Sequence, residues 1–333
     1  MHFKKPLLQL PVRFCADSLA AEVEALPSTA WMPHPQGFVG NEAVPLVSPH
    51  GQLTDSMKGP MAATEHLRRC PYIMALMAEL GAVWGRSRLM GLAPRSEVPS
   101  HIDIHYYWRT HIRIHIPVVT NPSVRFTCGG DSVHMAPGEC WIFDSFQLHD
   151  VQNKDDERRI HLVIDTVGGE NLWHLIEAAE RGAAPPATPW IPQAGAEQSP
   201  SLAFESLNIP EVMSSWEIRC HIDYLLEHTS PDLMLEPLIR RLERFTAAWG
   251  AAWFRFGSSD EGLSAYRRLI VEVRRDLAAM PSRRVTLTNG APLYRALEAI
   301  IFSRAVIADR TETPDAAPET RTGGTPRDDL TDR

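Results

Sequence analysis

Hydrophobic and polar residues alternate strictly over residues 111–116 and again over residues 159–165. Successive side chains of a β-strand point to opposite faces, so this pattern predicts strands with one apolar and one polar face. Residues 124–127 and 140–143 are two further apolar stretches of strand length, and turn-forming Asn-Pro, Gly-Gly and Pro-Gly pairs separate these four stretches. Short strands at this spacing predict a sandwich or barrel such as a jelly roll, which we place at about residues 86–168.

Helical periodicity is found on both sides of the predicted strands. The first 90 residues indicate helices and loops, with an irregular segment rich in Pro and Gly at residues 27–63. After the strands, Leu172, Leu175 and Ile176 share one helical face. We therefore predict an α+β fold: a double-stranded β-helix of the jelly-roll or cupin-like type, with N-terminal helices and a helical C-terminal region.

Changes in composition divide the chain into four parts. Residues 1–182 hold the predicted β-core and its helices, and residues 183–202 carry five prolines and predict a linker. Residues 203–309 form a helical region, whereas residues 310–333 have almost no large apolar residue and predict a disordered tail. Three helical segments are indicated in the third part, at about residues 211–228, 231–250 and 260–280.

Charge and cysteine content exclude several classes of protein. With 33 Lys and Arg against 41 Asp and Glu, the net charge of −8 offers no basic excess for binding nucleic acid. No apolar run is long enough to cross a membrane, and the N-terminus lacks the cleavage site of a signal peptide. Five cysteines without a C-x-x-C pair exclude a zinc ribbon and predict reduced thiols in a cytoplasmic protein.

Histidine is concentrated in the predicted strands, since seven of the 14 histidines lie between residues 101 and 161. His101 and Asp103 are two residues apart, so on a strand both side chains point to the same face. His149 follows 46 residues after Asp103, beyond another predicted strand. Two imidazoles and one carboxylate form the facial triad of non-haem Fe(II) oxygenases, which leaves coordination positions open for a cosubstrate and oxygen.

Arginines on the polar faces of two strands strengthen this interpretation. Arg159 follows His149 by ten residues, and Arg113 and His115 share a face of the strand after the H-x-D pair. A buried guanidinium is suited to bidentate recognition of a carboxylate. Together these residues offer a cation for the far end of a metal-chelating dicarboxylate and a hydrogen-bond donor nearer the metal.

These motifs resemble the aspartyl/asparaginyl β-hydroxylase family over roughly residues 20–170, and within it the bacterial proline cis-4-hydroxylase branch. The resemblance is specific because four motifs occur in the family's order. They are H-x-D at His101–Asp103, R-x-H at Arg113–His115, G-E-x-W-x-x-D at Gly138–Asp144 leading to His149, and R-x-H-L-V-x-D at Arg159–Asp165.

The resemblance implies a β-helix that uses Fe(II), 2-oxoglutarate and O2. It implies that His101, Asp103 and His149 ligate the iron, and that no catalytic residue is needed beyond this metal centre. Arg159 would pair with the C5 carboxylate of 2-oxoglutarate, while His115 and Arg113 would contact carboxylates nearer the metal.

Two of these arginine assignments have alternatives. Arg113 is equally suited to the substrate's carboxylate. Arg159 could instead form a surface ion pair with one of the acids at residues 155–157, in which case Arg158 would be tested next, although alternation points Arg158 to the other face. His105 shares the face of His101 if that strand continues, and we expect it to line a pocket rather than to act as a fourth ligand.

The activity implied is hydroxylation of an unactivated C–H bond of an amino acid or aminoacyl residue, at the β-carbon of Asp or Asn or on a proline ring, with release of succinate and CO2. The expected partner is an amino-acid or peptide substrate. Two alternatives come from other classes. One is a cupin-like metal-binding protein without oxygenase activity, and the other is a peptide-docking protein that acts through its C-terminal helices.

The C-terminal helices carry wide apolar faces that must pack on another surface. That surface is either the β-core or the same region of a second subunit, which leaves a homodimer as an alternative. We expect packing near the mouth of the barrel, because a small substrate needs enclosure. In the segment at residues 260–280, one such face is made of Leu263, Tyr266, Leu269, Ile270, Val273 and Leu277.

Overall fold

The computed structural model describes residues 3–33, 39–193, 200–280 and 284–306, together with the backbone of residues 320–321. The strands are β1 (Leu7–Arg13), β2 (Met32–Pro33), β3 (Asn41–Pro49), β4 (Met61–Ala63), β5 (Val83–Leu92), β6 (Glu97–Ile102), β7 (Ile112–Val119), β8 (Arg125–Cys128), β9 (Asp131–Val133), β10 (Glu139–Phe143), β11 (His149–Gln152), β12 (Arg159–Gly168), β13 (Ala203–Phe204) and β14 (Thr320–Arg321). The α-helices are α1 (Ala16–Glu24), α2 (Glu65–Arg68), α3 (Pro71–Leu80), α4 (Tyr106–Thr110), α5 (Glu170–Glu180), α6 (Ser215–Glu227), α7 (Leu235–Phe256), α8 (Leu263–Ala279) and α9 (Leu293–Leu297). The structure also describes two 3-10 turns, η1 (Ser28–Ala30) and η2 (Asp260–Gly262), and a π-helical turn, η4 (Glu298–Phe302).

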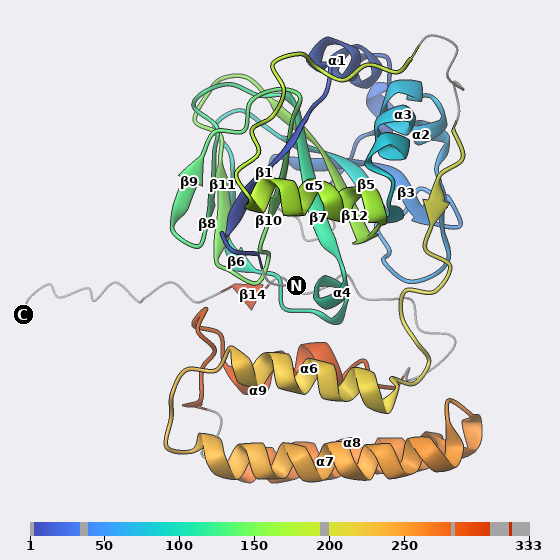
Figure 1. Cartoon of the computed structure of the whole chain (residues 1–333), viewed down its shortest axis with the longest axis vertical. Coiled ribbons are helices and arrows are strands. Elements are labelled where there is room, and N and C mark those ends of the chain that lie inside the picture. Colours follow the sequence, from blue (N-terminus) through green and yellow to red (C-terminus); the bar gives the residue numbers. More distant parts are fainter. Residues whose placement is uncertain (1–2, 34–38, 194–199, 281–283, 307–319, 322–333) are drawn as a thin grey trace, which may run out of the picture.

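Two largely antiparallel sheets form the upper part of the molecule in Figure 1. In the described part of the chain, the larger sheet has nine strands: seven lie along the path β1-β10-β7-β12-β5-β3-β2, while β4 pairs with β3 and β13 with β5. The smaller sheet has five strands in the order β14-β6-β11-β8-β9. Apolar side chains from both sheets, among them Phe126 and Val151 of the smaller and Phe143 of the larger, share one buried cluster. The predicted fold class, a double-stranded β-helix with flanking helices, is confirmed.

The alternation in β7 and β12 places apolar and polar side chains in two different environments. On one face, Ile114, Ile116, Leu162 and Ile164 join the main hydrophobic core with residues of α1, α3 and α5. Burying each such side chain contributes roughly 1.5–3 kcal/mol. The other face turns inward between the sheets, and its polar side chains are also buried, including Arg159 at 4% exposure. The polar face therefore lines the interior rather than meeting solvent.

The N-terminal 90 residues contribute more strand than the sequence predicts. Helices α1 and α3 are present, but β1, β3, β4 and the start of β5 also belong to the larger sheet and lie outside residues 86–168. Strand β3 lies in the segment that the sequence predicts to be irregular. Its prolines, Pro45 and Pro49, contribute to that prediction. The pairing of β3 with β5 shifts register just after Pro45, and a bulge of this kind is where a strand tolerates proline.

The C-terminal helices pack beneath the β-helix, at the end where the loops after β6 and β10 lie (Figure 1). Ile102, Ile104, Tyr106 and Phe146 of the core join one buried cluster with side chains of α6, α7, α8, α9 and η4. We call this contact the junction. Three helices fall within or near the three predicted segments, and α6 begins with a capping box between Ser214 and Glu217. The expected packing near the barrel mouth is confirmed.

The segments on either side of these helices are described in part. Trp190, within the proline-rich stretch at residues 183–202, donates its backbone N–H to Arg13 O at 2.7 Å and packs edge-on against Phe14. The predicted disordered tail lies outside the described residues, except that Thr320–Arg321 pairs with β6. All five cysteines are free thiols. Among the described helices none has the length and apolar character of a membrane span.

Candidate metal centre

The smaller sheet brings His101, Asp103 and His149 together. Strands β6 and β11 are antiparallel neighbours in which His149 stands directly opposite His101. Asp103 follows the end of β6, where its backbone N–H donates to Ser145 O at 3.0 Å. One ligand atom from each of the three side chains lies within 4.8 Å of the other two, and all three residues are buried. The residues that the motif spacing selected therefore converge on one point.

Backbone carbonyls fix the orientation of both imidazoles. Nδ1 of His101 lies 2.8 Å from Pro99 O, and Nδ1 of His149 lies 2.9 Å from Gln147 O. Because a carbonyl oxygen only accepts, each Nδ1 carries the proton and each Nε2 presents its lone pair. The two Nε2 atoms lie 4.0 Å and 3.9 Å from the carboxylate oxygens of Asp103. Nε2 of His149 is buried and has no hydrogen-bond partner among the described residues.

The charge states suit a divalent cation. Burial lowers the pKa of His149 to about 4, so its imidazole is neutral at neutral pH. Burial alone would raise the pKa of Asp103, but Arg113, His149 and His101 outweigh it and hold that pKa below its ordinary value. Deprotonated carboxylate and neutral imidazole are the forms that ligate a metal. Two histidines and one aspartate fit Fe(II) by donor type.

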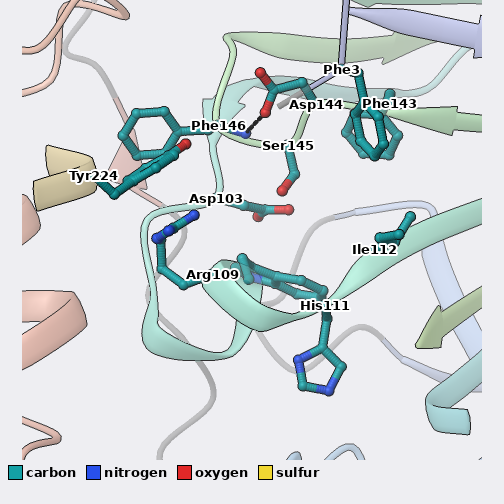
Figure 2. A pocket seen from close by; sticks show the side chains of 11 residues that line it. Phe3, Asp103, Arg109, His111, Ile112, Phe143, Asp144, Ser145, Phe146 and Tyr224 are labelled. Atoms are coloured by element: carbon teal, nitrogen blue, oxygen red, sulfur yellow. Dashed lines mark hydrogen bonds between the residues drawn. The ribbon is translucent and has the colours of Figure 1, made fainter. Parts of the chain in front are cut away.

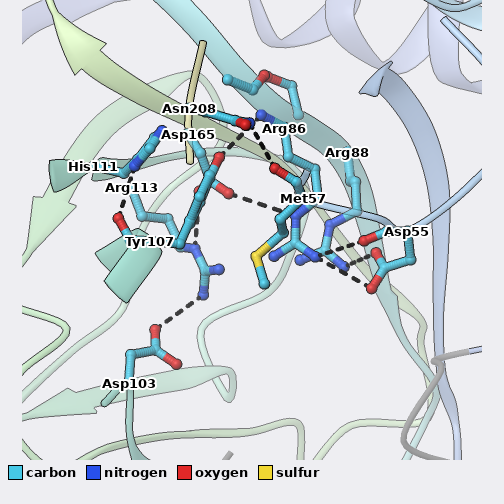
Figure 3. Close-up of polar contacts among 12 residues, drawn as sticks. Asp55, Met57, Arg86, Arg88, Asp103, Tyr107, His111, Arg113, Asp165 and Asn208 are labelled. Carbon is cyan, nitrogen blue, oxygen red and sulfur yellow. Dashed lines mark hydrogen bonds and ion pairs between the residues drawn. The ribbon is translucent and has the colours of Figure 1, made fainter. Parts of the chain in front are cut away.

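Arg113 connects the metal-binding cluster to the larger sheet (Figure 3). Its Nη1 lies 3.4 Å from Asp103, and its Nε donates to Asp165, the residue opposite it on β12, at 3.1 Å. The guanidinium also stacks over the ring of Trp108, 3.9 Å from the centroid. Arg113 thus pairs with two aspartates at once and holds the carboxylate of Asp103 in place.

Arg159 lies in the same cavity without an acidic partner. The cavity has a volume of about 70 Å³ and is lined by His101, His149, Arg113, His115 and Arg159, among others. Arg159 makes a 2.6 Å hydrogen bond to His161, but its Nε is unpartnered and no ion pair to it exists in the described ranges. Burial lowers its pKa to about 9, so it is still charged at neutral pH. A buried cation without a protein anion is suited to an anionic ligand.

His115 lies on β7, the strand of Arg113, and lines the cavity together with Arg113 and Arg159. It pairs across the ladder with Val163 of β12, while its ring packs edge-on against Phe126 and Phe143. Neither ring nitrogen has a hydrogen-bond partner among the residues described. Burial holds the pKa of His115 well below its ordinary value, so the neutral ring offers one donor and one acceptor to a ligand.

The structure also decides the alternatives for the neighbouring residues. Arg158 points away from the cavity: it pairs with Glu42 at 2.7 Å and stacks on Trp31. Asp156, one of the acids considered for Arg159, pairs instead with Arg95. The strand of His101 ends at Ile102, and His105 accepts a hydrogen bond from Tyr107 N–H at the start of α4. His105 is therefore a helix cap rather than a continuation of the metal-binding strand.

With this geometry established, comparison with known proteins gives a family. Residues 56–168 match the family model described as aspartyl/asparaginyl beta-hydroxylase. This match covers about a third of the chain, and it lies within the segment that carries the motifs. The match covers the H-x-D pair, His149 and Arg159, and it confirms the resemblance seen in the motifs. No match is found among curated proteins. The family and the His-Asp-His cluster together support a 2-oxoglutarate-dependent oxygenase.

Three solved structures with low similarity to this chain are described as oxygenases or prolyl hydroxylases. A 2OG-Fe(II) oxygenase family protein from Burkholderia pseudomallei is 15% identical, with 51% of this chain and 88% of that chain covered and a TM-score of 0.39. A prolyl-4-hydroxylase from Pseudomonas putida is 14% identical, with 50% and 95% covered and a TM-score of 0.35. A prolyl hydroxylase from Trichoplax adhaerens, solved with a hypoxia inducible factor peptide fragment, is 10% identical, with 51% and 87% covered and a TM-score of 0.35.

Strand β5 and the loop that contains Asp55 carry charged groups that the sequence reasoning missed. Arg86 and Arg88 lie on β5, and both guanidinium groups pair with Asp55 (Figure 3). Arg86 also lies 3.7 Å from Asp165. The two arginines are two residues apart on a strand, which is the same signal that selected His101 and Asp103. Asp55 carries no such signal, because it lies outside any strand or helix.

Proposed function

We propose that this chain is an Fe(II)- and 2-oxoglutarate-dependent hydroxylase of an amino acid or aminoacyl residue. The observation that carries the proposal is that His101 and His149 of the metal-binding cluster line the same cavity as Arg159. A cluster of metal ligands alone is compatible with many classes of metal-binding protein. A cation without an acidic partner in the same cavity adds the feature that a metal-chelating dicarboxylate requires.

His101, Asp103 and His149 would hold the iron. When bound, Fe(II) with 2-oxoglutarate and O2 supplies the oxidising chemistry that hydroxylates an unactivated C–H bond and releases succinate and CO2. The chain's own contribution is geometric: Pro99 and Gln147 fix the two imidazole rings, and Arg113 fixes the carboxylate. Such supporting contacts typically change metal affinity about 10- to 100-fold when they are lost.

Arg159 would bind the C5 carboxylate of 2-oxoglutarate through charge-assisted hydrogen bonds. His115, neutral and unpartnered, would donate to an oxygen nearer the metal. Because Arg113 already pairs with Asp103 and Asp165, we assign it to positioning Asp103 rather than to anchoring 2-oxoglutarate. The aromatic walls formed by Phe126 and Phe143 keep bulk water away from this cavity, which strengthens each of these contacts.

Two kinds of substrate are proposed from the family: the β-carbon of Asp or Asn, and the ring of proline. Support comes from the cationic groups around Asp103, since Arg113 and Arg86 both act to lower the pKa of this carboxyl group (Figure 3). Cationic groups near the metal suit a substrate with a carboxylate.

The test has two stages. Protein loaded anaerobically with Fe(II) and 2-oxoglutarate should show a weak visible charge-transfer band, because a 2-oxo acid can chelate the open half of the metal site. Amino acids and Asp-containing peptides are then screened for succinate formation coupled to a product 16 mass units heavier. Bound iron without the band would contradict the cosubstrate assignment and favour a metal-binding protein without oxygenase activity.

A further inference from the structure

A second, smaller pocket opens beside Asp103 on the side of the C-terminal helices (Figure 2). Its volume is about 20 Å³, enough for one or two waters or for a single carboxylate group. Residues from helix α4, the loop after β10 and helix α6 line it, among them Trp108, Arg109, Phe146 and Tyr224. The pocket therefore exists only where the β-core and the C-terminal helices meet.

Arg109 is the cation of this pocket. Its guanidinium stacks over Tyr224 of α6, with Cζ 3.2 Å from the ring centroid. Its Nε is buried without a hydrogen-bond partner, and no ion pair to Arg109 is found among the described residues. Burial lowers the pKa of Arg109 from its ordinary, strongly basic value, which leaves the group charged at neutral pH. Figure 2 shows Arg109 and Tyr224 together, with Asp103 beside them.

The two acids that line the pocket are already engaged. Asp103 pairs with Arg113 and belongs to the metal-binding cluster. Asp144 accepts hydrogen bonds from the backbone N–H of Phe146 at 3.1 Å and from Gln147 at 3.4 Å. Stacking on Tyr224 offsets part of the cost of burying the Arg109 charge but satisfies none of its N–H donors. An anion that entered the pocket would find these donors available.

We propose that this pocket is the subsite for a carboxylate of the substrate, bound by Arg109, and that α6 shapes the subsite through Tyr224. The inference rests on the proposed function and names the substrate class: a molecule with a carboxylate close to the reacting C–H bond. The pocket is too small for a polypeptide to pass through, so the carboxylate must end a branch of the substrate. It is either the α-carboxylate of a free amino acid or the side-chain carboxylate of an aspartyl residue.

Binding of matched carboxylate and amide probes tests this subsite. The full-length protein, loaded anaerobically with Fe(II) and 2-oxoglutarate, is titrated with L-proline and L-prolinamide by saturation-transfer NMR. The second pair is a capped Asp peptide and its Asn counterpart. We expect the carboxylate member of one pair to bind at least about 10-fold more tightly than its amide, because a charge-assisted hydrogen bond is lost in the amide. The pair that shows the difference identifies which carboxylate is bound.

Variants then assign the effect to Arg109. Arg109→Gln should weaken binding of the preferred carboxylate about 10- to 100-fold and leave the amide unchanged. Arg109→Lys keeps the charge and should retain part of the preference. Arg240→Gln is the matched control, since Arg240 is exposed on α7 and pairs only with Glu236 there.

Two results would overturn the proposal. If Arg109 only holds α6 against the core, Arg109→Gln lowers the unfolding midpoint. It then weakens binding of the carboxylate and the amide of each pair equally. If neither wild-type pair shows a carboxylate preference, the pocket binds no substrate carboxylate. Slow succinate formation without substrate, and binding of 2-oxoglutarate itself, report on the proposed function separately. Both are measured on the wild-type protein, so failure of one proposal is distinguishable from failure of the other.

Discussion

The cavity between the two sheets and the junction with the C-terminal helices are both buried, yet their composition is opposite. Polar and charged side chains converge around open space in the cavity, and several of their atoms, such as Nε of Arg159, have no protein partner. The junction is mainly an apolar cluster with few polar groups, such as Tyr106, which donates to Glu217, and Arg109, whose Nε has no partner among the described residues. Buried polar groups without partners cost stability, so their concentration in the cavity indicates ligand binding.

A second contrast separates the arginines within the cavity. Arg113 pairs with Asp103 and Asp165, so its charge is used to orient the protein's own groups. Arg159 has no acid to pair with and keeps its charge for a ligand. Both are inward-facing arginines of the larger sheet, and the sequence motif does not distinguish them. The difference is decided by whether a carboxylate stands opposite on the neighbouring strand.

Removal of the junction should have the largest effect. A fragment of residues 1–184 loses α6–α9, which cover Ile102, Ile104 and Tyr106, and it also loses β13, which pairs with β5. We expect this fragment to be insoluble or inactive, because a large apolar patch is exposed. Solubility and succinate formation are the measurements, and a 1–306 fragment is the control. A soluble 1–184 fragment with full, substrate-dependent turnover would show that the helices are an independent module and would favour the peptide-docking interpretation.

Loss of a metal ligand should abolish iron binding without unfolding the protein. We expect His149→Ala to reduce bound Fe(II) to background after anaerobic dialysis, because two remaining ligands hold Fe(II) poorly. His174→Ala, an exposed histidine on α5, should bind iron as the wild type does. Circular dichroism checks that both variants are folded. Stoichiometric iron in folded His149→Ala would remove His149 from the metal site.

Arg159→Ala should leave iron binding largely intact and weaken 2-oxoglutarate binding by roughly 2–5 kcal/mol, by analogy with truncated buried ion pairs. Arg158→Ala is the adjacent control. Arg158 faces the other way and pairs with Glu42, so we expect its loss to leave 2-oxoglutarate affinity unchanged. Anaerobic titration of the charge-transfer band measures both affinities. Equal affinity in Arg159→Ala and wild type would make Arg159 a structural residue.

Acidification should lower the free energy of unfolding through His221 at the junction, and this effect should be smaller than those of the substitutions above. Burial lowers the pKa of His221 on α6 to about 4, against an ordinary value of about 6.5. Between these pH values the unfolded chain binds a proton that the folded chain does not, so the free energy of unfolding falls as pH falls from about 6.5 to about 4.

His221→Phe should reduce this pH dependence by at most one proton, because His221 packs edge-on against Tyr106 as a phenyl ring could. Urea unfolding midpoints between pH 4 and pH 7 measure the change, and His174→Phe on the exposed face of α5 is the control. An unchanged pH dependence in His221→Phe would mean that His221 is protonated in the folded chain.

Some of the architecture could be predicted because it leaves a periodic signal. The alternation over residues 111–116 and 159–165 indicates β7 and β12, and the H-x-D spacing puts His101 and Asp103 side by side. Strand β3 was not predictable in this way, because burial on both faces removes the alternation and its prolines suggest a loop. The same applies to Asp55, whose pairing with Arg86 and Arg88 joins segments about 30 residues apart.

The sequence by itself determined the fold class, the candidate metal ligands and the cationic residues of the inner face, because each depends on spacing along one strand or on motifs in a fixed order. Only the tertiary structure decided which arginines are paired, since a guanidinium is neutralised by acids from other strands. It also decided that Arg109 and Tyr224, 115 residues apart, stack on one another at the junction. Contacts of this kind follow from how the C-terminal helices pack on the barrel, and no local pattern encodes that packing.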